Sequence, residues 1–105
     1  MEADIKRILV LLESFQASND VVVMIRDQKT HAIEERLPTE TELINYVDVP
    51  IAIHLYNKIT SQFLTLMCDE RDKALGEFAV PLASDIVEVL TRYVKEVKHV
   101  SSIST

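Results

Sequence analysis

Three histidines are the first candidates for metal binding or catalysis in this sequence: His31, His54 and His99. No two of them lie three or four residues apart, the spacing that places two ligands on one face of a helix. A zinc site needs three or four such ligands in a defined geometry. The sequence therefore predicts no metal site and no bound cofactor.

Cys68 and the carboxylates that follow it are the second candidate. The run Asp69, Glu70 and Asp72 surrounds the only cysteine with negative charge, which disfavours a reactive thiolate. Asp69 and Asp72 share a helix face and could together contact a divalent cation, but such runs are more often solvated helix ends with pairs such as Asp69 and Lys73. We expect a structural cysteine, no internal disulfide and a reducing compartment.

Serine nucleophiles and phosphate loops are the third possibility. Ser14, Ser18 and Ser84 have no histidine and acid in a recognisable arrangement, and Gly76 is the only glycine, so no glycine-rich loop is present. We expect no enzymatic activity.

Composition narrows the class of partner. The chain has 105 residues, 48% hydrophobic and 6% aromatic, with a net charge of −6, which suits one domain whose core is aliphatic. Nucleic-acid and anionic-lipid surfaces repel such a chain. The first residues do not resemble a signal peptide, and no apolar run is long enough to span a membrane. We expect a cytoplasmic, intracellular protein whose partner is another protein with a basic surface.

Scarce glycine and proline favour helices joined by short connections. Apolar spacing predicts helices over 3–18, 49–75 and 82–99. A capping box, Thr39 followed by Glu42, predicts a short helix that continues through Val47. In the 49–75 helix an apolar arc covers more than half of the circumference, which is typical of a central helix.

Residues 20–37 allow two interpretations. As a helix, they place Val22, Ile25, Ile33 and Leu37 near one face. As a hairpin, the β-branched run 21–25 is a strand, residues 27–30 turn the chain with His31 in the left-handed conformation, and 31–37 return.

The sequence thus predicts an all-α fold: a single domain over residues 1–100, with four to five helices around the long central one, and a frayed tail over 101–105. An α+β fold with a hairpin at 21–37 is the alternative. The function that we expect is a small acidic protein–protein interaction module, such as an adaptor, assembly factor, regulator or inhibitor, that forms a homodimer. Its partner-binding residues are predicted on the far edge of the apolar arc: Ile53, Tyr56, Thr60, Phe63, Leu64 and Met67. These six are contact residues or, alternatively, core residues covered by the first and last helices.

A helix-turn-helix transcription regulator over residues 38–59 is the alternative function. The segment LPTETEL followed by VDVP is similar to the opening of winged-helix repressors. Such a resemblance implies a second helix that reads DNA, yet this helix would present only His54, Asn57 and Lys58 to a groove, and Asp48 replaces the usual turn glycine.

Overall fold

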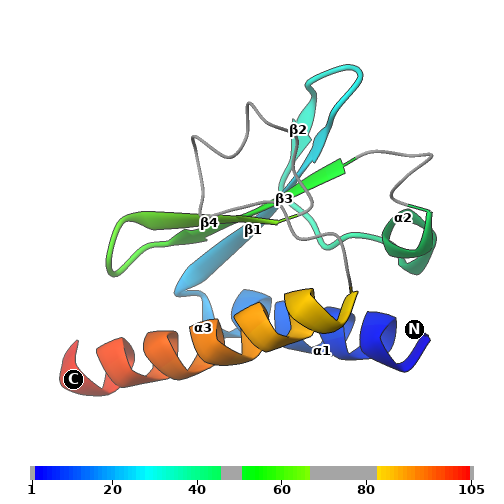
Figure 1. Cartoon of the computed structure of the whole chain (residues 1–105). Helices are drawn as coiled ribbons and strands as arrows, with labels where there is room; N and C mark the ends of the chain where they lie inside the picture. The colour runs from blue at the N-terminus through cyan, green and yellow to red at the C-terminus, as the bar shows by residue number, and fades with distance from the viewer. Residues whose placement is uncertain (1, 46–50, 67–82, 105) are drawn as a thin grey trace.

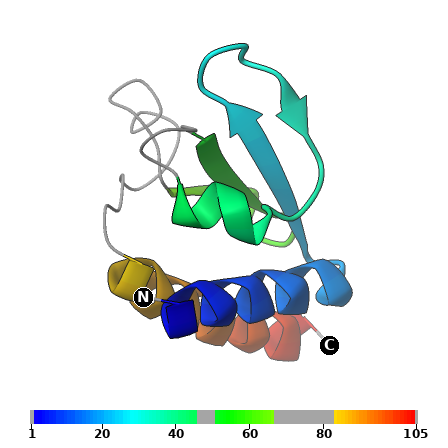
Figure 2. The same ribbon diagram turned by 90° about the vertical axis from the view of Figure 1, so that its right-hand side faces the viewer.

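The computed structural model describes residues 2–45, 51–66 and 83–104, which form two layers (Figures 1 and 2). In chain order the elements are α1 (Glu2–Ser18), β1 (Val21–Asp27), β2 (Ile33–Glu34), α2 (Glu40–Ile44), β3 (Ile51–Asn57), β4 (Gln62–Leu66) and α3 (Ala83–Ser104). One layer is an antiparallel sheet with strand order β2-β1-β3-β4, and the other holds α1 and α3 side by side. The fold is α+β, so the predicted all-α bundle is wrong.

The hairpin alternative for residues 20–37 is confirmed. β1 pairs with β2 through Ile25 and Glu34 and through Arg26 and Ile33. His31 ends the connecting turn with a φ of 63°, the left-handed conformation expected of it. The helical interpretation of this segment is therefore wrong.

The predicted long helix over 49–75 is also wrong wherever the structure describes it. Residues 51–57 form β3, and β4 follows after a turn. β3 lies between β1 and β4, and every residue from Ile51 to Leu55 is buried. Four of these five residues are apolar and only His54 is polar, so the strand lacks the clear alternation of a half-buried strand. This largely apolar run looks like a very wide apolar arc when it is drawn as a helix. Residues 67–75 lie outside the described residues.

The predicted first and last helices are confirmed as α1 and α3. α3 continues to Ser104, into the segment expected as a tail. Every helix in the described ranges is too short or too polar to cross a lipid bilayer.

The capping box before α2 is confirmed. Glu42 N donates to Thr39 Oγ1 at 3.1 Å, and Thr39 N donates to Glu42 Oε1 at 2.9 Å. Each side chain satisfies a backbone donor that the first helical turn leaves without an acceptor. α2 is thereby fixed at one end of the sheet, in contact with α1.

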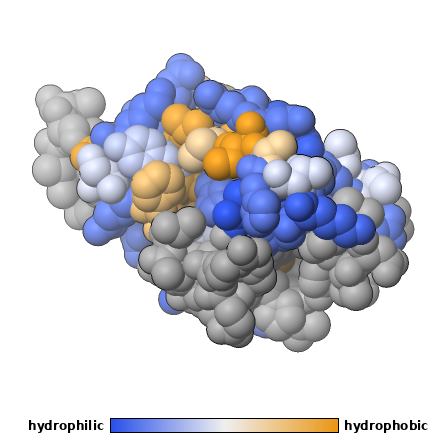
Figure 3. Space-filling model, turned by 90° about the horizontal axis from the view of Figure 1, so that it is seen from above, coloured by the Kyte–Doolittle hydropathy of each residue, from blue (hydrophilic) through white to orange (hydrophobic). Residues whose placement is uncertain are grey.

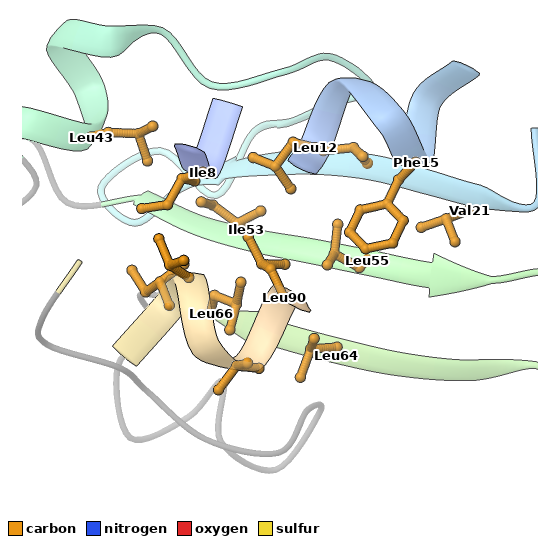
Figure 4. Close-up of a cluster of buried hydrophobic side chains, with 14 of the residues drawn as sticks. Ile8, Leu12, Phe15, Val21, Leu43, Ile53, Leu55, Leu64, Leu66 and Leu90 are labelled. Atoms are coloured by element: carbon orange, nitrogen blue, oxygen red, sulfur yellow. The ribbon is translucent and has the colours of Figure 1, made fainter. Parts of the chain in front are cut away.

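The core fills the space between the two helices and one face of the sheet (Figure 4). Its most deeply buried large side chains come from α1, β3, β4 and α3: Ile8, Leu12, Ile53, Leu55, Leu66 and Leu90. Phe15 of α1 meets Tyr93 of α3 edge to face, with ring centroids 5.4 Å apart. This core fixes the sheet, and Phe63 is exposed on the opposite face.

Candidate protein-binding surface

The face of the sheet that is turned away from the helices carries a row of three apolar side chains. Val22, Tyr56 and Phe63 are direct neighbours across β1, β3 and β4, and we call them the outer row. The Tyr56 and Phe63 ring centroids are 4.8 Å apart at an interplanar angle of 40°. Phe63 is 48% exposed, whereas Val22 and Tyr56 are partly buried. Figure 3 views this face and shows apolar atoms gathered among polar ones.

The turn between β3 and β4 sets the register that brings Tyr56 and Phe63 together. Asn57 Oδ1 accepts hydrogen bonds from the backbone N–H groups of Ile59 and Thr60, at 2.9 and 3.2 Å. Ser61 N donates to Asn57 O at 2.8 Å, and Ser61 has a φ of 58°. The Asn57 side chain thus holds the turn by hydrogen bonds, and Ser61 occupies the left-handed position where a glycine is usual.

The next row along the same face contains the partly buried Met24 and two buried polar residues, His54 and Thr65. His54 and Thr65 are cross-strand neighbours, and His54 Nδ1 lies 3.0 Å from Thr65 Oγ1. Burial lowers the pKa of His54 below its ordinary value of 6.5, and the positive charge of Arg26 lowers it further. His54 therefore carries a neutral ring over a wider pH range than an exposed histidine. Beyond this row the same face carries Ile33, which pairs with Arg26 and is 60% exposed.

A groove of about 100 Å³ runs beside this surface, between β4 and α3. Phe63 belongs to both, so the accessible apolar surface continues from the sheet face to the sheet edge. The groove is lined by Gln62, Phe63, Leu64, Val89, Arg92, Tyr93 and Glu96. The exposed Arg92 and Glu96 provide charges of both signs at its rim.

The predicted contact residues divide between the two faces of the sheet. Tyr56 and Phe63 lie together on the outer row, and Thr60 is exposed in the adjacent turn. Ile53 and Leu64 point to the helices and are buried, with 0% and 3% of their surface exposed. These two are core residues, because in a strand successive side chains alternate between faces. Met67 lies outside the described residues.

Val22 is the member of the surface that sequence reasoning missed. It comes from a distant part of the chain and is adjacent to Tyr56 only through the pairing of β1 with β3. The run Val21 to Val23 contains the information that identifies Val22, because successive residues of a strand face opposite sides of the sheet. The hairpin alternative, which assigns that run to a strand, separates buried Val21 and Val23 from Val22.

The other candidate residues have local structural roles or lie outside the described residues. Ser18 donates to Phe15 O at 2.7 Å and accepts from Asp20 N at 3.3 Å, so it ends α1. His31 is part of a turn. The described segments contain no group of three histidine, cysteine or acidic side chains that could hold a metal ion. Cys68 and the carboxylate run 69–72 lie outside those segments.

Comparisons with known proteins do not place the chain in a family. No protein-family model matches it, and neither the curated proteins nor the solved structures provide a match. The function is therefore argued from the geometry of the outer row and its surroundings.

Proposed function

We propose that the protein is a small protein-binding module, an adaptor, assembly factor or inhibitor, that docks a partner on the outer row of its sheet. The observation that carries the proposal is the aromatic pair Tyr56 and Phe63, whose tilted rings are in contact on the face opposite the helices, with Phe63 48% exposed. Aromatic side chains contribute much of the energy when proteins associate. The binding element is thus a sheet face, not the helix face that the sequence had indicated.

The rigidity of this surface supports the proposal. Tyr56 belongs to β3, which is hydrogen-bonded on both sides, and Phe63 is held against it by the turn at Asn57. Little conformational entropy is lost when a partner covers side chains that are already ordered. Burial of a Phe side chain stabilises a contact by roughly 1.5–3 kcal/mol.

The charge of the chain supports attraction of a basic partner. The net charge of −6 steers basic surfaces at long range. At contact the outer row itself is apolar, so steering and binding reside in different residues. Rates of association should fall as salt is added, while the apolar contact is retained.

We do not propose DNA binding. The alternative required a second helix beginning near residue 50, but residues 51–57 form the central strand β3. His54, which would have faced the groove, is buried and hydrogen-bonded to Thr65.

The proposal is tested by affinity capture from the native source with the full chain, comparing wild type with Phe63→Glu. A charged side chain on the outer row should abolish retrieval of the proteins that wild type binds specifically. Ile44→Glu is the matched control, because Ile44 is 47% exposed on α2, away from the outer row. Chemical unfolding of each variant checks that the fold is kept.

Purified candidates from that capture are then titrated against the same three proteins by calorimetry. We expect at least a tenfold weaker Kd for Phe63→Glu and an unchanged Kd for Ile44→Glu. Equal binding by folded Phe63→Glu and wild type would show that the outer row is not the docking surface.

A further inference from the structure

The face of α1 that is turned away from the sheet carries an exposed valine. Ile8 and Leu12 of α1 are fully buried, whereas Val10 is 63% exposed. Among the large hydrophobic residues that the structure describes, Val10 has the highest exposed fraction. One exposed valine is unremarkable by itself. The charges around Val10 make this face distinctive.

The surface beside Val10 is hollowed. A cavity of about 240 Å³ opens between α1 and α3 and is lined by Lys6, Arg7, Val10, Leu11 and Thr91. Val10 therefore stands at the border of a depression with apolar walls, and a side chain from another molecule has room beside it.

Small and charged residues are placed at similar distances before and after Val10 along the exposed face of α1. Two turns of helix span slightly more than seven residues, so Ala3, Val10 and Ala17 follow one line along the exposed face. Lys6 and Glu13 lie on the same flank of this line, before and after Val10. All five residues are on the solvent side of α1, with Ala3, Lys6, Glu13 and Ala17 exposed as Val10 is.

We propose that this face binds a second copy of the chain, with the two α1 helices antiparallel and a twofold axis at Val10. The twofold axis brings the two valines together and places the small residues Ala3 and Ala17 opposite each other. It also places Lys6 of each copy beside Glu13 of the other, on the same flank, which forms two ion pairs between the copies.

The charges select the antiparallel orientation and a copy of the same chain. Parallel helices related by a twofold axis along their length would place Lys6 of each copy beside Arg7 of the other, which is repulsive. On the opposite flank, the antiparallel arrangement brings Arg7 next to the hydroxyl of Ser14, so no like charges meet there. A twofold interface that uses one patch twice is the commonest form of self-association.

This contact is separate from the outer row, because α1 lies against the opposite face of the sheet (Figure 2). The proposal does not rest on the proposed function, and each surface can be removed without the other.

Sedimentation equilibrium of the full chain, over micromolar to millimolar concentrations, tests the proposal. The wild-type mass should rise from 12.0 kDa towards twice that value. Val10→Glu should weaken association at least tenfold, because it places two like-charged carboxylates together at the twofold axis. Ile44→Glu and Phe63→Glu should associate as wild type does.

Charge reversal gives the decisive comparison. Lys6→Glu and Glu13→Lys should each weaken association, because like charges then meet twice across the axis. The double variant should restore it, since both ion pairs re-form with reversed sign and the net charge equals that of wild type. A wild type that stays at 12.0 kDa throughout, or a folded double variant that associates no better than either single variant, would overturn the proposal.

Discussion

Asp27 and Asn57 occupy equivalent positions in the two hairpin turns of the sheet. Asp27 Oδ1 accepts hydrogen bonds from the backbone N–H groups of Lys29 and Thr30 at 2.7 and 3.0 Å. Asn57 Oδ1 accepts in the same way from Ile59 and Thr60, which lie two and three residues after it. In both turns the backbone oxygen of the first residue also accepts from the N–H of the fifth, at 2.8 Å. The stretches DQKTH and NKITS therefore build the same turn from different residues.

Replacing Asn57 should test how far this turn fixes the outer row. Asn57→Ala removes the acceptor for two backbone N–H groups and should lower the free energy of unfolding by about 1–2 kcal/mol. Asn57→Asp keeps an acceptor oxygen at the same position and should cost much less. Urea unfolding of the two variants measures the difference. Equal losses would mean that packing of the buried Asn57 side chain matters more than its hydrogen bonds.

The repeated turn explains why the sequence pointed to helices. A single glycine favours helices over a sheet with tight turns, but His31 and Ser61 adopt the left-handed conformation without being glycine. The turn of the first hairpin was predicted because Asp27 and His31 were recognised there. Comparing DQKTH with NKITS would have revealed the second turn and divided the supposed long helix at Asn57.

Glycine at Ser61 should stabilise the protein. Ser61 has a φ of 58°, and the left-handed conformation costs a residue with a Cβ roughly 1 kcal/mol relative to glycine. Ser61→Gly should therefore raise the melting temperature by a few degrees, while Ser61→Val should lower it because a β-branched residue tolerates this conformation poorly. Differential scanning calorimetry orders the three proteins. A Ser61→Val variant as stable as wild type would contradict the assignment of strain to this residue.

The central strand was beyond sequence reasoning for a different reason. Ile51 to Leu55 are all buried and only His54 among them is polar, so periodicity does not separate such a strand from a buried helix. His54 increased the difficulty because it was placed on the polar stripe of a helix, whereas its ring is buried against Thr65. Of the surface, Tyr56, Thr60 and Phe63 were predicted, but Val22 needed the strand register.

Arg36 and Glu42 form an ion pair whose loss should be visible as a change in acid stability. Arg36 donates to both carboxylate oxygens of Glu42, at 2.8 and 2.9 Å. The hydrogen bonds from Arg36 are the main cause that lowers the pKa of Glu42 from 4.5 to about 2. Stability from this pair is fully present above pH 4.5, and it is lost as the pH falls through the lowered pKa of about 2.

Glu42→Gln should therefore be less stable than wild type at neutral pH, and the difference should shrink below pH 4.5. Unfolding of both proteins by urea at several pH values gives this difference directly. Glu40→Gln is the control, because Glu40 is exposed and lies in the same first turn of α2. If the difference in free energy of unfolding between wild type and Glu42→Gln does not change with pH, the charge of the Glu42 carboxylate is not the source of the stability.

The buried pair His54 and Thr65 predicts a second pH dependence, at milder acidity. Burial, and then the charge of Arg26, lowers the pKa of His54 below 6.5 in the folded protein. Between that lowered pKa and 6.5 the unfolded chain binds more protons than the folded one, so the free energy of unfolding falls as the pH drops. Full stability from the neutral ring is present above pH 6.5 and is lost as the pH decreases towards the folded pKa.

His54→Asn should remove this dependence, because asparagine does not titrate and its amide reaches the position of Nδ1. Wild type should lose stability between about pH 7.5 and about pH 5.5, whereas His54→Asn, less stable at the upper end, should lose much less. Thr65→Val is the control, since it removes the hydroxyl but leaves the histidine, so its stability should still fall with pH. If His54→Asn and wild type lose stability in parallel over this range, the proton is taken up elsewhere and the lowered pKa of His54 is not its source.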